Sequence, residues 1–233
     1  YTVGALTGLA KNSIISNVAL TQKTVTSGDS NSGKGVLGRN ITGGIIGSAF
    51  GDCYITGLTS TDVIVQSSFY NDEKDRYKTY LNNTSNSKTI RQNENQLRAR
   101  FFSDAGIESV SFAGGVIGYS DTYLTNEISS LEFVYGQNLN DSRYAIKKLV
   151  VNGSVDVRGE VVGGVIGFTG INTKAKDISL TISKGDGLSN NLLSYNGFAG
   201  SIVGYANGQF HQVYAEHDEK TQDLIETSTK NYY

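Results

Sequence analysis

Val162-Gly-Gly-Val-Ile-Gly167 is one of five glycine-rich hexapeptides that divide this chain of 233 residues into similar segments. The others are Val3-Gly-Ala-Leu-Thr-Gly8, Thr42-Gly-Gly-Ile-Ile-Gly47, Ala113-Gly-Gly-Val-Ile-Gly118 and Ala199-Gly-Ser-Ile-Val-Gly204. Their leading glycines lie 39, 71, 49 and 37 residues apart, and all but the second spacing are typical of repeat proteins. The hexapeptides hold 13 of the 28 glycines, so the glycine excess follows a pattern that a flexible linker would lack. The sequence therefore indicates a chain built from repeated units.

The residues around each hexapeptide favour β-strands. A polar turn follows the glycines, and then a short apolar run such as residues 53–58 or 209–214, bounded by Gly, Asn, Asp and Ser. Valine, isoleucine and glycine alternate from Val161 to Phe168, so both faces of an extended strand here would be apolar or bare. That pattern predicts a strand buried on both sides. Glycine at the same point in every copy further predicts a tight corner in each repeat.

The position after the last glycine of each hexapeptide is aromatic in three copies, as Tyr119, Phe168 and Tyr205. If the copies stack in register, these three rings are expected to stack as well. The sequence thus predicts an all-β fold, a parallel β-solenoid that is right-handed, with irregular loop insertions. The alternative is a β-sandwich of hairpins, which needs short regular turns and a cleaner alternation of apolar and polar residues. The glycines expected to have a structural role in the repeat are Gly4, Gly8, Gly43, Gly47, Gly114, Gly118, Gly163, Gly167, Gly200 and Gly204.

At these residues the chain resembles the GLUG-motif repeat, in which a V-G-G-L-V-G pattern is followed by a turn and an I-x-N-C/V strand. Residues 41–47, 112–118, 161–167 and 198–204 match the glycine half, and Ser16-Asn17-Val18 matches the second half. The irregular spacing of the copies departs from the family. The resemblance implies a parallel β-helix within a large exported bacterial protein, such as an adhesin or the region upstream of the protease domain in IgA-protease relatives.

A single repeat-built domain is predicted over residues 1–215, with an insertion at about 69–104 and a tail or linker at 216–233. Residues 58–105 contain no glycine, and Tyr70 to Asp104 is polar and charged. Further excursions from the repeat are expected at residues 132–148 and 185–196. Insertions in solenoids lie on one face, often the binding face, and Tyr and Arg are enriched at interface hot spots. The alternative is a solvated loop without a function. The residues predicted to bind a partner are Tyr70, Tyr77, Tyr80, Arg91, Arg98, Arg100, Phe101 and Phe102.

Composition argues against several function classes. The net charge of −2 gives no electrostatic reason to expect nucleic acid as a partner. The longest apolar stretches have about ten residues, whereas a membrane-spanning helix needs about 20. A single cysteine, Cys53, excludes an internal disulfide framework and is expected to be a buried thiol. On one strand His211 and His217 would lie about 20 Å apart, too far for one metal ion. No metal or cofactor is therefore expected.

An enzyme is the less favoured function. Polysaccharide-cleaving β-helices need two or more carboxylates that flank one glycosidic bond. Asp52 and Asp121 follow their glycines at similar offsets, which would place them near one another in a stack. Like charges repel there, and a turn-capping role is the ordinary explanation. The carboxylates considered are Asp52, Asp62, Asp121, Asp156, Glu160 and Asp177.

The expected function is a non-catalytic structural and binding segment of a secreted or surface-attached bacterial protein. Its expected location is extracellular or on the bacterial cell surface, and its expected partners are a protein or glycan there. The chain begins at Tyr1 and contains no methionine, so we expect a processed product or a piece of a longer polypeptide. The alternatives left open are a polysaccharide-cleaving enzyme and a subunit of a larger surface assembly.

Overall fold

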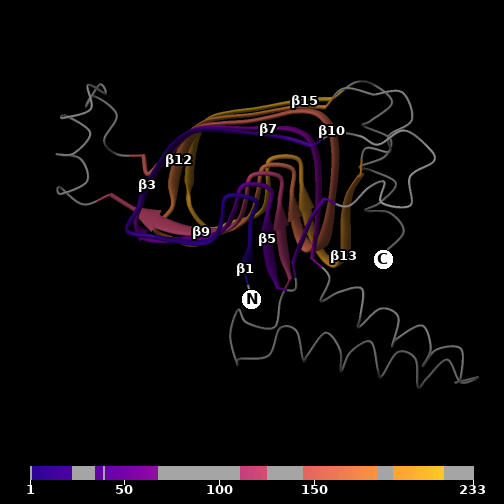
Figure 1. Ribbon diagram of the computed structural model, residues 1–233, viewed down its shortest axis with the longest axis horizontal. Helices are drawn as coiled ribbons and strands as arrows, with labels where there is room; N and C mark the ends of the chain where they lie inside the picture. Colours follow the sequence, from indigo (N-terminus) through magenta and orange to yellow (C-terminus); the bar gives the residue numbers. More distant parts are fainter. Residues whose placement is uncertain are drawn as a thin grey trace, which may run out of the picture.

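A computed structural model of the chain describes residues 2–22, 35–38, 40–67, 111–124, 144–182 and 191–217. These residues form β-strands in two sheets, and every strand pair within the sheets is parallel (Figure 1). The described residues are therefore all-β with parallel strands, an architecture consistent with a solenoid. The strands are β1 (Thr2–Val3), β2 (Thr7–Lys11), β3 (Ile14–Thr21), β4 (Val36–Gly38), β5 (Ile41–Gly43), β6 (Ile46–Asp52), β7 (Tyr54–Ser67), β8 (Phe112–Gly114), β9 (Ile117–Tyr123), β10 (Ile146–Gly163), β11 (Ile166–Thr169), β12 (Lys174–Ile182), β13 (Asn191–Gly200), β14 (Val203–Ala206) and β15 (Gln209–His217).

Each repeat contributes a strand to the second sheet between two strands of the first. In the second repeat, β5 belongs to the ten-stranded first sheet, β6 to the five-stranded second sheet, and β7 returns to the first. The second sheet has the order β14-β11-β9-β6-β2, so each of its strands lies beside the equivalent strand of a neighbouring repeat. In the first sheet, β3, β7, β10, β12 and β15 succeed one another in the same way and run side by side in Figure 1.

The leading glycines of the hexapeptides form one column, as the predicted stacking requires. Gly114 pairs with Gly43 on one side and with Gly163 on the other, and Gly163 also pairs with Gly200. The pairing of Val3 with Thr42 extends the same register to the first copy. A β-sandwich of hairpins is antiparallel, and the described strand pairs are all parallel.

The hexapeptide is not one strand, and the prediction of a single strand buried on both faces is wrong. In the fourth copy, β10 ends at Gly163, the chain bends at residues 164–165, and β11 begins at Ile166 in the other sheet. The bend brings the carbonyl oxygen of Ile166 so close to Gly163 that a Cβ atom there would lie 1.8 Å from it. Equivalent Cβ atoms at Gly43, Gly114 and Gly200 would lie 1.8–2.0 Å from a carbonyl oxygen three residues ahead. The corner therefore requires glycine because of close backbone approach, and these glycines do not have a left-handed φ.

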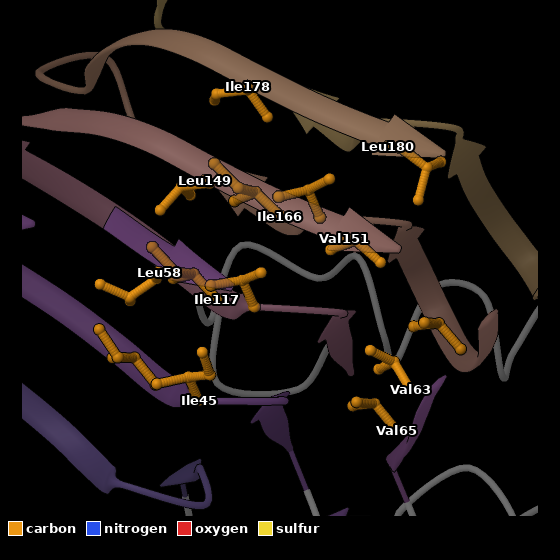
Figure 2. Close-up of a cluster of buried hydrophobic side chains, with 14 of the residues drawn as sticks. Ile45, Leu58, Val63, Val65, Ile117, Leu149, Val151, Ile166, Ile178 and Leu180 are labelled. Carbon is orange, nitrogen blue, oxygen red and sulfur yellow. The ribbon is translucent and has the colours of Figure 1, made fainter. Parts of the chain in front are cut away.

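The main core is filled by columns of aliphatic side chains, one from each repeat (Figure 2). Leu58, Leu149 and Ile178 form one such column on adjacent strands, and each is at most 1% exposed. Side chains from the second sheet, including Ile117 and Ile166, pack against this column from the opposite side. Burying each side chain of this size contributes about 1.5–3 kcal/mol.

A second column runs through the first sheet and was not predicted. At one equivalent position in each repeat the backbone is left-handed, with φ between 54° and 66°. The flanking pairs place these five residues beside one another. Each of these residues interrupts the alternation of side chains between the two faces of its strand. Ile146 and Leu149, three residues apart, are therefore both fully buried. The column consists of Asn17, Gly57, Lys148, Asp177 and Gln212.

Two predicted excursions are shorter than expected. The sequence suggested loops at residues 132–148 and 185–196, but β10 already begins at Ile146 and β13 at Asn191. The first half of β13 pairs with Asp156–Gly159 of β10 and buries Leu192. The polar residues that flank Leu192 and Leu193, among them Asn190, Asn191 and Asn196, hid the strand from sequence analysis. At the other end, β15 extends to His217.

Candidate functional site

The residues predicted to bind a partner lie outside the described part of the chain. Tyr70, Tyr77 and Tyr80, Arg91, Arg98 and Arg100, and Phe101 and Phe102 all fall between β7 and β8, within residues 68–110. The insertion at 69–104 and most of the tail at 216–233 share this position outside the described ranges. Their role in binding therefore stays a prediction.

The predicted aromatic stack is confirmed. Tyr119, Phe168 and Tyr205 pair in register on β9, β11 and β14. The ring centroids of Tyr119 and Phe168 are 5.5 Å apart, and those of Phe168 and Tyr205 are 4.9 Å apart at an angle of 7°. Phe112 from the first sheet adds a fourth ring, 4.8 Å from Phe168. We call Phe112, Tyr119, Phe168 and Tyr205 the aromatic ladder.

The aromatic ladder changes from buried to exposed along the stack. Phe112 and Tyr119 are 2% and 6% exposed, whereas Tyr205 is 41% exposed. Phe198 packs edge-on against Tyr205 and is itself 48% exposed. The inner rings hold neighbouring repeats together, and the outer pair presents aromatic surface at the end of the stack. Such rings gain about 0.5–1.5 kcal/mol per contact with another aromatic group beyond the burial of area.

The carboxylates considered as catalytic groups have local structural partners. Asp121 accepts hydrogen bonds from the backbone and side-chain amides of Asn172, at 3.0 and 3.2 Å, and so fixes the turn after β11. Asp62 accepts hydrogen bonds from the backbone N–H and the hydroxyl of Ser154, both at 3.1 Å. Both carboxylates therefore have structural partners in a neighbouring repeat, and for Asp121 that partner lies in a turn.

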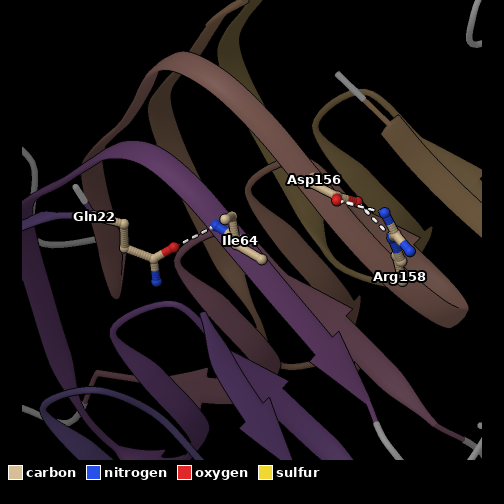
Figure 3. Close-up of polar contacts among 4 residues, drawn as sticks. All are labelled: Gln22, Ile64, Asp156 and Arg158. Carbon is tan, nitrogen blue, oxygen red and sulfur yellow. Dashed lines mark hydrogen bonds and ion pairs between the residues drawn. The ribbon is translucent and has the colours of Figure 1, made fainter. Parts of the chain in front are cut away.

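Asp156, Asp177 and Asp52 complete this group. Asp156 accepts two hydrogen bonds from the guanidinium group of Arg158 on the same strand, at 2.7 and 2.6 Å (Figure 3). The same view shows the side chain of Gln22 accepting a hydrogen bond from the backbone N–H of Ile64, which ties the end of β3 to β7. The Oδ2 atom of Asp177 lies 3.6 Å from the Nζ atom of Lys176. Asp52 does not stack on Asp121 as the sequence suggested, because its register partner is Tyr123.

Glu160 differs from the other carboxylates because it is buried. Its side chain is 3% exposed, and its Oε2 accepts a hydrogen bond of 3.0 Å from the backbone N–H of Ser111. The hydroxyl of Ser111 in turn accepts a hydrogen bond of 3.0 Å from the backbone N–H of Glu160. Burial raises the pKa of Glu160 from 4.5 to about 7, although the hydrogen bond from Ser111 opposes the shift. This carboxyl group therefore changes charge near neutral pH.

Two lysines on adjacent strands of the first sheet each lie over a tyrosine ring. The ammonium group of Lys147 lies 5.0 Å from the ring centroid of Tyr54, and that of Lys176 lies 5.6 Å from the ring of Tyr144. Tyr144 also stacks on His211 at 6.2 Å. Lys147 and Lys176 are register partners, and cation–π contacts of this kind partly offset the burial of their charges.

Cys53 is buried, as the sequence predicted. Its thiol donates a hydrogen bond of 3.0 Å to the carbonyl oxygen of Phe50, and burial raises its pKa. A thiol with these properties is poorly nucleophilic. Within the described ranges, no group of three or more His, Cys, Asp or Glu side chains is arranged to hold a metal ion.

Comparison with known proteins gives no relative. No protein-family model, no curated protein and no solved structure matches this chain. The resemblance to GLUG-motif repeats therefore stays a prediction. None of the described residues forms a helix that is long and apolar enough to cross a membrane.

Proposed function

We propose that this chain is a non-catalytic structural and binding segment of a secreted or surface-attached bacterial protein, built as a right-handed parallel β-solenoid. The observation that carries the proposal is the uniform register of equivalent strands through all five repeats. A stack of this kind gives length and stiffness, because each repeat contacts mainly its neighbours. The aromatic ladder and the aliphatic columns supply the contacts between neighbours.

The proposed partners are a protein or a glycan at a surface, together with the rest of a longer parent chain. The resemblance of the hexapeptides to GLUG-motif repeats supports the extracellular location and the adhesin-like role. The insertion at 69–104, with its tyrosines and arginines, is the segment proposed to recognise the partner.

Binding to an array of surface glycans and extracellular matrix proteins tests this function. The unmodified chain of 233 residues, here called the parent, is expected to retain one or more ligands. A variant without residues 71–98 is expected to stay folded and to lose these ligands. A triple variant, Arg91→Ala, Arg98→Ala and Arg100→Ala, separates loss of recognition from loss of the whole segment, and Lys174→Ala on β12 is the matched control. Equal retention by the parent and the deletion variant contradicts a binding role for the insertion.

An assay for polysaccharide cleavage distinguishes the enzymatic alternative from the proposed function. Incubation of the chain with acidic polysaccharides is expected to leave their length unchanged over hours, as measured by size-exclusion chromatography. Cleavage that disappears when two of the carboxylates are replaced together by amides establishes an enzyme and overturns the proposed function.

A further inference from the structure

The two ends of the stack concentrate the exposed apolar surface of the described residues. Of the ten large hydrophobic side chains exposed there, seven belong to the first or last repeat. Only Phe50, Tyr123 and Ile171 lie elsewhere. The end residues are Leu6, Leu9 and Ile14 in the first repeat, and Phe198, Tyr205, Val213 and Tyr214 in the last.

These ends are also the open edges of both sheets. Among the described strands, β2 and β14 terminate the second sheet, and β3 and β15 each pair with one strand of the first. An edge strand presents a row of backbone N–H and C=O groups that can pair with another strand. The edges therefore combine apolar side chains with free pairing capacity.

The two edges are complementary, because each continues the same columns. Val213 ends the column that Val18 begins, through Leu58, Leu149 and Ile178. Tyr205 ends the column that Leu9 begins in the second sheet. If one more repeat of this sequence followed the last, Val18 would lie on Val213 and Leu9 on Tyr205, in the register already used between neighbouring repeats.

Charge does not oppose this contact. The described strands of the first repeat carry one charged side chain, Lys11, and β14 and β15 carry Glu216 as their one acidic side chain and no Lys or Arg. The two ends therefore carry opposite rather than like charges.

We propose that the last repeat of one chain binds the first repeat of a second copy, so that β15 and β14 pair in parallel with β3 and β2 of that copy. The contact continues the interface between repeats and does not depend on the proposed surface location or on recognition by the insertion. Because the two edges are different surfaces, the contact is head-to-tail and leaves a free edge at each end, so it propagates into open chains rather than stopping at a dimer.

Sedimentation velocity over a range of concentrations tests the proposal. The weight-average mass of the parent chain is expected to rise with concentration beyond twice the 25.0 kDa of one chain. Leu9→Lys blocks one edge and Val213→Lys the other, because each places a charge against an apolar side chain of the partner. Each variant alone is expected to remain monomeric.

Sedimentation of a mixture of the two variants is the decisive measurement. Each still has one intact edge, so an equimolar mixture is expected to form a complex of two chains and nothing larger. Ile171→Lys, at a residue 72% exposed within the fourth repeat, is the matched control and is expected to assemble as the parent does. Tyr214→Lys replaces Val213→Lys if thermal unfolding shows that the latter does not fold.

Three outcomes overturn the proposal. A parent chain that stays monomeric at all concentrations removes it, and one such cause is coverage of the last edge by residues 218–233. Dimerisation of one blocked variant while the other stays monomeric indicates a two-fold symmetric contact through a single edge instead. Blocked variants that assemble as the parent does place the contact away from the two ends. None of these outcomes bears on ligand retention by the insertion, so the proposed function is tested separately.

Discussion

Gly163 shows how one residue sets the corner of a repeat. A Cβ atom there would lie 1.8 Å from the carbonyl oxygen of Ile166, and Gly43, Gly114 and Gly200 face the same restriction in their own copies. The second glycine has a different neighbour, because a Cβ atom on Gly164 would meet the carbonyl oxygen of Ser201 in the next repeat at 2.2 Å. The last copy has serine at this position, with no following repeat among the described residues. The first copy departs from this pattern, because it carries Ala5 at the second position although a repeat follows it. In the three middle copies the glycines thus report contacts within and between repeats.

Gly163→Ala is expected to destabilise the chain by at least about 2 kcal/mol, because the backbone must move to admit one methyl group. Urea unfolding measures the change. Ala5→Gly, at the exposed second position of the first copy, is the control and is expected to cost no more than about 1 kcal/mol. A Gly163→Ala variant as stable as the parent contradicts the close-approach explanation of the corner.

Glu160 makes stability depend on pH. Its pKa is raised in the folded chain to about 7 from 4.5, so the folded state retains the proton over a range in which the unfolded chain has lost it. The stabilisation is fully present below pH 4.5 and is lost as the pH rises to about 7. Glu160→Gln keeps a neutral group that accepts the hydrogen bond from Ser111 and is expected to remove this slope from the free energy of unfolding.

The measurement is urea unfolding of parent and Glu160→Gln between pH 4.5 and 8. The difference in stability between the two is expected to change across this range in favour of the glutamine variant at the higher pH. If the free energy of unfolding varies with pH in parallel for the two proteins, Glu160 does not titrate differently in the folded and unfolded chains. Asp156→Asn, at a carboxylate paired with Arg158, serves as the comparison.

At the scale of the strand, the column of left-handed residues turns each long strand of the first sheet. Lys148 and Gln212 occupy it with φ of 54°, a conformation that costs a residue other than glycine about 1–2 kcal/mol. Gly57 occupies the same column in the second repeat without that cost. The strain is therefore distributed unevenly among otherwise equivalent repeats.

Lys148→Gly is expected to stabilise the chain by up to about 1 kcal/mol, because it relieves a left-handed backbone at an exposed side chain. Lys174→Gly, at an exposed position of β12 without positive φ, is the matched control and is expected to destabilise by about 0.5–1 kcal/mol. Thermal unfolding of the three proteins distinguishes the two signs. Destabilisation by both glycines would mean that Lys148 contributes contacts that outweigh its backbone cost.

Sequence analysis could predict the recurring elements and missed those that recur only in space. The amino-acid sequence of the hexapeptide itself repeats, so the glycine column and the stacked rings of Tyr119, Phe168 and Tyr205 could be predicted from it. The left-handed column repeats only in backbone conformation, and the variety from Asn17 to Lys148 and Gln212 conceals it. Asn17, Gly57 and Asp177 tolerate positive φ and were the available signal. The open edges of the sheets could not be predicted, because the sequence does not show which strands lack a neighbour.

At the scale of the whole molecule, equivalent strands pair in parallel from one repeat to the next. Leu149 illustrates this, since it packs between Leu58 and Ile178 in one column of the core. Leu149→Ala is expected to cost about 2–5 kcal/mol, because it removes the middle side chain of a column. Ile171→Ala, at an exposed turn, is the control and is expected to change the free energy of unfolding by less than about 0.5 kcal/mol. Equal effects of the two substitutions in urea unfolding contradict the continuous core.

The distance between spin labels on the first and last repeats tests the stacked arrangement most directly. Thr21, Thr61, Asn152, Thr181 and Glu216 are successive register partners, four strand spacings in all. With Cys53 replaced by alanine, labels at Thr21→Cys and Glu216→Cys are expected to give a narrow distribution centred about 19 Å apart, widened by the label arms, at about 4.8 Å per strand. Labels at Thr21→Cys and Thr181→Cys are expected to lie one spacing closer. A broad distribution, or a distance that does not shorten between these two pairs, would contradict the stack.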